Sequence, residues 1–524
     1  MSYSSVLYLL PFLGGTLLLY NVAPRRLRPG VLLLASYIFY LWNSPATLVF
    51  LLLATALVYY GGLFLESLSR THAVAKAYLP REEKKSFKQA VTRQKKAVCA
   101  VVLVLLFGTL AMLKYYGWLS ESVNAVLSLW DLPRLPGWKL LLPLGISYYT
   151  LIAAGYLIDV YRGKISATRS VLQLALFLSF FPQIVEGPIA RFSDSAEALM
   201  AGQRTSYRNL TFGAQRILWG LMKKMVVADR AAPFVAEVFG NTEKYGGAVL
   251  LCGGILFTVQ IYMEFSGCMD IVLGSAELFG VTLPENFERP FFSASVSEFW
   301  RRWHITLGAW LRDYVFYSVS LSGGFARMSK AARARLNSFF ANLIPAATAL
   351  FCVWFCCGIW HGAGWKYLVY GMYYYGIMLA GMLCEPLLAK LRPKNGGWWF
   401  RAFCILRTWV LVVIGMTLFR AESLADFGTI VSKVCTAFAP AALVDGTLLH
   451  LGADGWDLIV IGIGCALILA VSLWQERGHS LRETVAARPL ALRWCAYLAL
   501  ILCVVVFGAY GPGYEQVDFI YGQF

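Results

Sequence analysis

Long apolar runs constrain this chain more than any other feature of its sequence. A run of about 20 apolar residues can cross a bilayer as one helix. Only Asn43, Ser44 and Pro45 separate the second run from the third, as in a tight hairpin or a re-entrant pair. The pattern predicts an all-α, polytopic membrane protein with about 11 to 13 transmembrane or re-entrant helices. The candidate runs lie at residues 4–21, 31–43, 46–66, 97–115, 139–160, 170–188, 209–228, 246–264, 267–282, 341–361, 366–388, 402–419, 456–474 and 488–510.

The composition agrees with this class. Hydrophobic residues make up 59% of the 524 residues and charged residues 14%, whereas an ordinary soluble chain is roughly 25% charged. No Lys or Arg precedes Arg25, and a cleavable signal peptide needs a basic segment at its start. We therefore expect the first run to be a retained membrane helix, and residues 1–524 to form a single integral membrane domain.

Basic residues cluster between the apolar runs. The formal net charge is +17, and in membrane proteins Lys and Arg collect in cytoplasmic loops. The densest stretch, 70–96, holds nine of them and is expected to be a cytoplasmic loop or an amphipathic surface helix. The other basic stretches are 25–28, 223–230, 327–335, 390–401 and 477–493. This distribution predicts an extracytoplasmic N-terminus, and because it forms no continuous basic face it argues against nucleic acid as a partner.

Several common chemistries lack their sequence signals here. The 12 cysteines include no CxxC and no zinc-site spacing, so we expect no metal and interpret them as small apolar filler. There is no Walker loop, no GxGxxG after a strand, no HExxH and no GxSxG. We find no internal repeat, which counts mildly against a secondary transporter.

The most informative region is 286–365, which contains a Trp-rich segment with several charged residues. Residues 297–317 are compatible with one helix, and Glu298 with Arg302 forms a favourable i,i+4 pair. Helical spacing would place Trp300, Arg301, His304, Gly308 and Leu311 on one face, with Arg302, Ala309 and Asp313 opposite. Charge on two faces is unusual for a lipid-facing span, so this helix is expected to line a polar cavity or lie in the interface.

His361 ends an uncharged apolar run and is followed by Gly362 and Gly364. An ionisable side chain near membrane depth is costly and usually functional, and imidazole can take a proton from a hydroxyl near neutral pH. The alternative is an interfacial histidine that only forms a hydrogen bond, and His304 has the same two interpretations. Glu186 and Arg191 flank a predicted helix break and are expected to form a structural pair.

These segments together resemble the membrane-bound O-acyltransferase superfamily. Within it, the chain is similar to the bacterial branch that contains the alginate O-acetylation membrane subunit and the teichoic-acid D-alanylation membrane protein. The similarity runs along nearly the whole chain. Its segments are 34–42 (LASYIFYLW), 142–149 (LPLGISYY), 181–191 (FPQIVEGPIAR), 264–267 (EFSG), 300–314 (WRRWHITLGAWLRDY), 360–362 (WHG) and the hexamer 519–524 (FIYGQF).

The resemblance implies a ring of helices around a central tunnel and acyl transfer across the cell membrane. It implies a cytoplasmic acyl-CoA donor, acetyl-CoA in the alginate-type branch, and no bound cofactor. It implies an extracytoplasmic SGNH-hydrolase-type partner that modifies a polysaccharide. By the same resemblance His361 is the catalytic histidine, His304 the second motif histidine, and Tyr521 an acyl acceptor. Motif or tunnel support would come from Trp300, Arg302, Trp303, Arg312, Asp313, Trp360, Glu186 and Arg191.

Two departures from the family pattern and two other functions complete this interpretation. Gly522 stands where an aromatic residue usually follows Tyr521, and Glu264 stands where Asp is common.

The first alternative function is a transporter or flippase of an acylated or lipid-linked carrier. The second is a structural scaffold for polysaccharide export, which predicts that both motif histidines can be changed harmlessly.

Overall fold

The computed structural model describes residues 1–138, 140–391, 393 and 397–510. Its described residues form helices and connecting segments, with one isolated β-bridge. The chain divides into two compact units: a first unit, Met1–Leu210 with Ser275–Pro284, and a second unit, Thr211–Gly274 with Glu285–Phe524. The predicted all-α class is confirmed for the described part of the chain.

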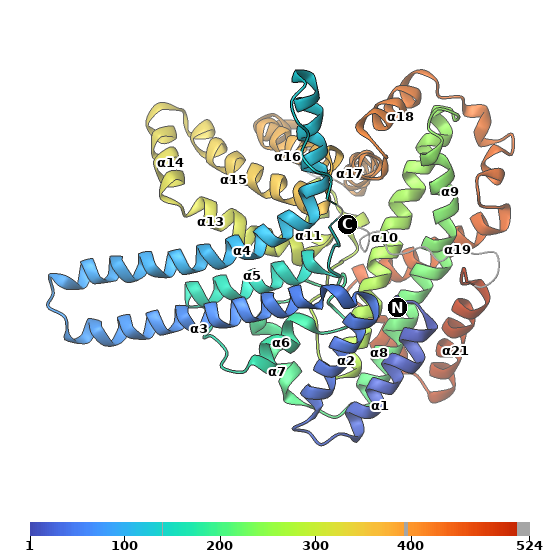
Figure 1. Ribbon diagram of the computed structural model, residues 1–524. Helices are drawn as coiled ribbons and strands as arrows, with labels where there is room; N and C mark the ends of the chain where they lie inside the picture. Colours follow the sequence, from blue (N-terminus) through green and yellow to red (C-terminus); the bar gives the residue numbers. More distant parts are fainter. Residues whose placement is uncertain (139, 392, 394–396, 511–524) are drawn as a thin grey trace. The chain divides into compact units, whose positions relative to one another are not determined.

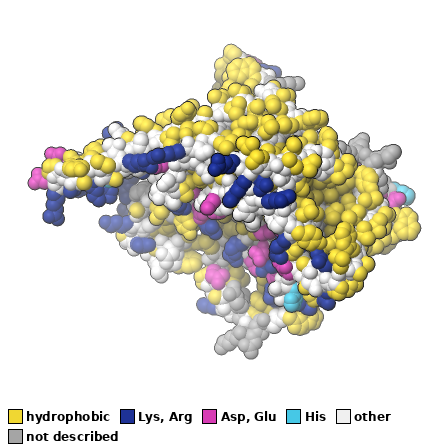
Figure 2. Space-filling model, turned by 90° about the horizontal axis from the view of Figure 1, so that it is seen from below, with side chains coloured by type: hydrophobic (Ala, Val, Ile, Leu, Met, Phe, Trp, Pro, Cys, Tyr) yellow, Lys and Arg dark blue, Asp and Glu magenta, His cyan; other side chains and the backbone are white. Residues whose placement is uncertain are grey.

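Eight helical segments in the described residues are long and apolar enough to cross a membrane. Large apolar side chains lie on their outer surfaces, and Figure 2 shows hydrophobic side chains over much of one face. Such surfaces are stable in lipid and unfavourable in water, so the protein is a multi-pass membrane protein. The eight are Pro45–Tyr78, Glu83–Trp130, Gly247–Leu278, Ser338–His361, Trp365–Lys390, Trp398–Arg420, Gly455–Glu476 and Leu490–Phe507.

Two details of the predicted spans can be compared directly. The expected break after residue 43 is confirmed, because α2 (Arg28–Asn43) ends there and Ser44 separates it from η2 (Pro45–Thr47) and α3 (Leu48–Tyr78). The expected separation of 246–264 from 267–282 is wrong, since α10 (Gly247–Leu278) is continuous. Ser266 and Gly267 do not interrupt it, because no proline is present and neighbouring backbone closes on that glycine.

In the first unit, the basic stretch 70–96 is the end of a helical hairpin. It comprises the last turns of α3, a turn at 79–82, and the first turns of α4 (Glu83–Leu127). Figure 1 shows α3 and α4 running side by side, and Figure 2 shows Lys and Arg gathered along this hairpin. The buried helix α5 (Ile146–Arg162) packs against both. The remaining helices of this unit are η1 (Tyr8–Gly14), α1 (Gly15–Val22), η3 (Ser128–Trp130), α6 (Val171–Ser179) and α7 (Phe192–Ala201).

In the second unit, α10 is packed closely by the segment formed by α8 (Tyr207–Leu221), η4 (Met222–Ala228) and α9 (Asp229–Gly240). Glycines make this possible: a β-carbon on Gly274 would lie 2.7 Å from the carbonyl oxygen of Gly213, and one on Gly220 would overlap the carbonyl of Gly267. Small residues at such crossings let helix backbones approach in a membrane. The crossing brings the charged side chains of η4 against those of α10.

These charges correct the sequence interpretation of 223–230 as a basic loop. Lys223 and Lys224 are buried in η4, with 8% and 1% of their surface exposed. The Nζ of Lys223 lies 2.7 Å from Oδ2 of Asp270, and the Nζ of Lys224 lies 2.7 Å from Oδ1 of Asp229 and 3.4 Å from Oε1 of Glu264. Carboxylates from α9 and α10 therefore allow these lysines to be internal.

The rest of the second unit holds the sequence motifs. Helices α15 (Ser338–His361) and α16 (Trp365–Leu391) pack side by side, and α16 packs on α17 (Trp398–Arg420). Helices α19 (Gly455–Glu476) and α21 (Leu490–Phe507) both pack against η4. The other helices are η5 (Pro290–Phe292), α11 (Val296–Arg302), α12 (Ile305–Trp310), η6 (Leu311–Phe316), α13 (Tyr317–Ser320), α14 (Gly323–Arg335), α18 (Leu424–Thr436), η7 (Pro440–Leu443), η8 (Thr447–His450) and α20 (Leu481–Ala486).

Candidate active site

The helix expected over 297–317 is broken at the second motif histidine. Ser295 caps α11 by accepting a hydrogen bond from the backbone N–H of Glu298, and α11 ends at Arg302. His304 then has a left-handed backbone, with φ 48° and ψ 50°. This conformation is uncommon outside glycine. The expected common face of Trp300, His304 and Leu311 is therefore wrong.

A preceding extended segment holds this break in place. The backbone N–H of Glu288 donates to the carbonyl of Arg302 over 2.9 Å, and that of Ile305 donates to the carbonyl of Asn286 over 3.0 Å. Phe287 and Trp303 form an antiparallel β-bridge between these bonds. Two backbone hydrogen bonds around the left-handed residue offset its conformational cost, which is about 1–2 kcal/mol.

His304 is buried, with 3% of its surface exposed. Its Nδ1 lies 3.2 Å from Oδ1 of Asn286, and its ring lies perpendicular to Phe265 at a centroid distance of 4.9 Å. Its ring centroid lies 5.6 Å from that of Trp360. Burial lowers the pKa of His304 well below its usual range, and the adjacent His361 lowers it further. His304 is thus a neutral imidazole near pH 7.

His361 is the last residue of α15 and is also buried, with 3% exposed. Its ring centroid lies 5.1 Å from Trp360, 5.6 Å from Tyr370 and 5.5 Å from Phe419. Three helices therefore contribute to its surroundings: α15, α16 and α17. Trp360 contacts both histidine rings, so the structure brings together two histidines that lie 57 positions apart in the chain.

Glycines fix where His361 lies. A β-carbon on Gly358 would lie 2.6 Å from the carbonyl oxygen of Tyr367, and one on Gly371 would overlap the carbonyl of Trp354. At Gly362 the aromatic ring of Tyr367 fills the space that a side chain would occupy. The group that packs closely against the glycine after His361 is therefore the side chain of this tyrosine of α16.

The other motif residues have different surroundings. Trp303 is in the core, stacked on Phe299 at 5.4 Å. The ring of Trp300 lies 4.7 Å from Tyr374 of α16. Arg302 makes the expected ion pair with Glu298, at 2.9 Å, and a second one with Glu476 of α19, at 3.2 Å.

The remaining motif residues make no contact with the histidine pair that the structure describes as part of the site. Arg312 pairs with Asp313 at 3.1 Å, with the arginine largely exposed. Glu186 and Arg191 belong to the first unit, in the connection between α6 and α7, where Glu186 is buried. Tyr521 and the hexamer 519–524 lie outside the described residues.

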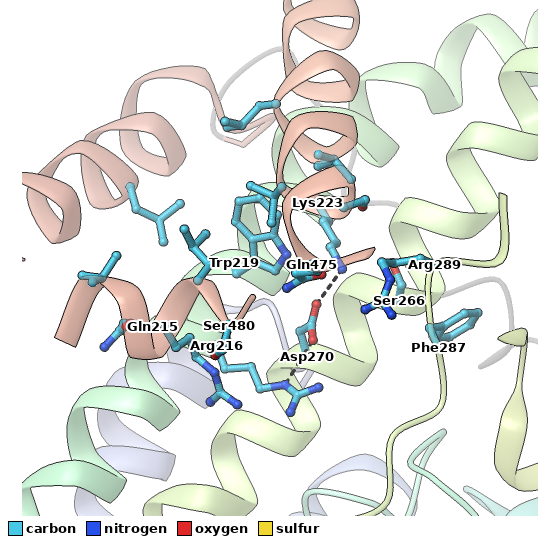
Figure 3. A pocket seen from close by; sticks show the side chains of 18 of the residues that line it. Gln215, Arg216, Trp219, Lys223, Ser266, Asp270, Phe287, Arg289, Gln475 and Ser480 are labelled. Atoms are coloured by element: carbon cyan, nitrogen blue, oxygen red, sulfur yellow. Dashed lines mark hydrogen bonds and ion pairs between the residues drawn. The ribbon is translucent and has the colours of Figure 1, made fainter. Parts of the chain in front are cut away.

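A cavity of about 860 Å³ adjoins this site in the second unit. One wall is polar and comes from α8, η4, α10 and the segment 285–289; another is apolar and comes from α19 and α21. Figure 3 shows Lys223 and Arg216 converging on Asp270, and Arg216 also pairs with Glu285. Asn286 both lines the cavity and contacts His304. The sequence interpretation did not single out Asn286, although it opens the 286–365 region.

Comparison with known proteins identifies the family of this chain. The model of the membrane-bound O-acyltransferase family matches residues 161–421, which include both histidines. The probable alginate O-acetylase AlgI of Azotobacter vinelandii is 32% identical over 427 residues, which is 81% of this chain and 76% of that protein. The chain belongs to the membrane-bound O-acyltransferase family. It is therefore a membrane-embedded enzyme that transfers acyl groups to oxygen.

Two further relatives of this acyltransferase have different names. The peptidoglycan O-acetyltransferase of Helicobacter pylori is 32% identical over 46% of this chain and 47% of that protein. The teichoic acid D-alanyltransferase of Bacillus subtilis is 26% identical over 55% of this chain and 71% of that protein. The family resemblance expected from the motifs is confirmed.

Proposed function

We propose that this acyltransferase moves an acetyl group from cytoplasmic acetyl-CoA to an extracytoplasmic acceptor, for O-acetylation of a cell-surface or exported polysaccharide. The observation that carries the proposal is the buried pair His304 and His361, joined by Trp360. Relatives named for O-acetylation of alginate and peptidoglycan support the acetyl group and the polysaccharide. The proposed location is the cell membrane, with the N-terminus extracytoplasmic.

His361 is the proposed general base. Its imidazole takes the proton of the acceptor hydroxyl, whose oxygen attacks the thioester carbonyl carbon. The C–O bond forms, the C–S bond breaks, and the imidazolium returns the proton to the departing thiolate. General base catalysis of this kind typically contributes about 10²–10⁴-fold. The aromatic rings around His361 exclude water, which would otherwise compete as acceptor.

The cavity beside Asn286 is the proposed donor chamber. It is lined by α20, part of the basic stretch 477–493 that the charge pattern predicts to be cytoplasmic. Arg482 of this helix lines it, and a guanidinium group suits the phosphates of a coenzyme. Arg216 and Arg289 line it too, but both are ion-paired with carboxylates. Asn286 lines this space and also contacts His304, so a donor held there would be one side chain away from that histidine.

The proposed acceptor is Tyr521 or a serine of an SGNH-hydrolase-type partner outside the membrane. In either case the acetyl group would reach the polysaccharide through that partner. The family resemblance supports this order of transfer. A secreted SGNH-type protein that co-purifies with the chain would support it further.

The test uses the full chain in liposomes, with labelled acetyl-CoA added on one side. The His361→Ala protein should transfer acetyl at least about 100-fold more slowly. The matched control is His450→Ala, which removes an exposed histidine in η8 and should behave as wild type. Gel filtration and thermal unfolding establish that both variants are folded. Full transfer by the His361→Ala protein, or movement of an intact carrier without label transfer, would contradict the proposal.

A second variant tests the donor chamber. Arg482→Ala should raise KM for acetyl-CoA with little change in kcat, because a group that binds the donor equally before and during reaction affects binding alone. Arg327→Ala, an exposed change in α14, is the control. An unchanged KM in the Arg482→Ala protein would remove the cavity from the mechanism.

A further inference from the structure

Asn286 is a buried side chain whose amide orientation is determined by its neighbours. It is 1% exposed. Its Oδ1 accepts hydrogen bonds from the backbone N–H of Thr306 over 3.1 Å and from that residue's hydroxyl over 2.9 Å. Its Nδ2 donates to the sulfur of Met269 over 3.3 Å. A backbone N–H can only donate, so the amide atom facing Thr306 must be the oxygen.

This orientation determines the tautomer of His304. The ring Nδ1 lies 3.2 Å from the same Asn286 oxygen, and two acceptors cannot share a hydrogen bond. Nδ1 therefore carries the proton, and in a neutral imidazole Nε2 is then the unprotonated nitrogen. Among the described residues, the buried Nε2 of His304 has no hydrogen-bond partner. A buried hydrogen-bond acceptor without a donor is energetically costly, unless a ligand or substrate donates a hydrogen bond to it.

Charged side chains on the helices next to His304 are ion-paired among themselves, except His361. On α15, the charge of a protonated His361 would lower the pKa of His304. On α10, the two carboxylates are held by lysines of η4: Glu264 by Lys224 and Asp270 by Lys223. On α11, Arg302 is held by Glu298 and Glu476. On η6, Asp313 is paired with Arg312.

We propose that Asn286 is a positioning residue that holds His304 as the neutral Nδ1–H tautomer, so that its Nε2 remains a hydrogen-bond acceptor beside His361. The proposal assigns different tasks to the two histidines. His361 exchanges the proton, and His304 stays uncharged and accepts a hydrogen bond from the reacting groups. Two adjacent imidazolium ions would repel each other, so fixing one ring as neutral leaves the proton to the other.

The catalytic part of this inference rests on the proposed acetyl transfer, whereas the tautomer does not. The backbone of Asn286 has a separate role. Its carbonyl oxygen accepts a hydrogen bond from the backbone N–H of Ile305, which supports the left-handed turn at His304. A side-chain substitution leaves that bond available. The consequences of changing the amide can therefore be separated from loss of the turn.

The decisive variant is Asn286→Asp, which keeps an oxygen acceptor for Thr306 and for Nδ1–H but adds a negative charge. A carboxylate in contact with His304 favours its imidazolium, which has no free Nε2 acceptor. The acidic limb of the pH profile for acetyl transfer should therefore move up by about 1–2 pH units, with activity approaching wild type at high pH. The control is Thr306→Val, which removes a donor to the same oxygen without adding charge and should leave that limb in place. An acidic limb that does not move in the Asn286→Asp protein overturns the proposal.

A spectroscopic measurement decides the tautomer without any activity. In the full-length protein labelled with ¹⁵N-histidine in lipid, the signals missing from a His304→Gln sample belong to His304. They should comprise a protonated Nδ1 and an unprotonated Nε2 throughout pH 6–8, and the Nε2 signal should become protonated at higher pH in Asn286→Asp than in wild type. A protonated Nε2 in the wild type would overturn the proposal even if acetyl transfer is observed. If acetyl transfer fails but this spectrum is found, the proposed function is wrong and the positioning by Asn286 stands.

Discussion

Replacing Gly371 by alanine should disrupt the contact that sets the position of His361. Gly371 lies where α16 crosses α15, and a β-carbon there would overlap the carbonyl oxygen of Trp354 and lie 3.1 Å from the Cα of Gly358. Both obstacles are backbone atoms, so no side chain can rotate away. The two helices must separate for the methyl group to fit.

Two opposing terms set the size of the effect. Alanine is favoured over glycine inside a helix by roughly 0.5–1 kcal/mol, while overpacking a close contact costs typically about 1–3 kcal/mol. Gly371→Ala should therefore be destabilising by up to about 2.5 kcal/mol. Gly376 lies on the same helix, and its β-carbon would meet nothing within 4 Å. Gly376→Ala has no overpacking cost, so it should be neutral or should stabilise the protein by the helix-propensity gain alone.

The assay compares thermal unfolding of the two variants in the same detergent, followed by acetyl transfer in liposomes. Because His361 is the last residue of α15, separation of the helices should displace its ring. A displacement of about 1 Å at a reacting group can reduce the rate about 100-fold. A Gly371→Ala protein as stable and active as Gly376→Ala would refute the close-contact reasoning.

Two other predictions concern buried charge. Asp270→Asn should destabilise the protein by about 3–5 kcal/mol because it leaves Lys223 buried without its carboxylate, and the double variant Lys223→Met with Asp270→Leu should recover much of that loss in thermal unfolding. Since burial holds the pKa of His304 below that of an unfolded histidine, the unfolded state binds an additional proton as the pH falls below about 6.5. The free energy of unfolding should then decrease by up to about 1.4 kcal/mol per pH unit. This slope should be smaller in His304→Gln; an identical slope would show that His304 is not the responsible group.

The motif region shows how far sequence reasoning reaches. The i,i+4 pair of Glu298 and Arg302 was predictable, because helical spacing is local and its partners lie one turn apart. The break at His304 was not, because the group that holds it, Asn286, is 18 residues earlier and outside any helical pattern. The burial of Lys223 was also hidden, since its partner Asp270 lies 47 residues away.

The apolar runs by themselves determined that this chain is an all-helical membrane protein, because in lipid a helix satisfies its backbone hydrogen bonds within one segment. The motifs along the chain were sufficient to place it in its family. Only the tertiary structure decided which side chains meet: His304 with His361 through Trp360, and the lysines of η4 with the carboxylates of α9 and α10. Those pairings depend on how closely helices pack, and that is set by glycines whose neighbours are distant in sequence.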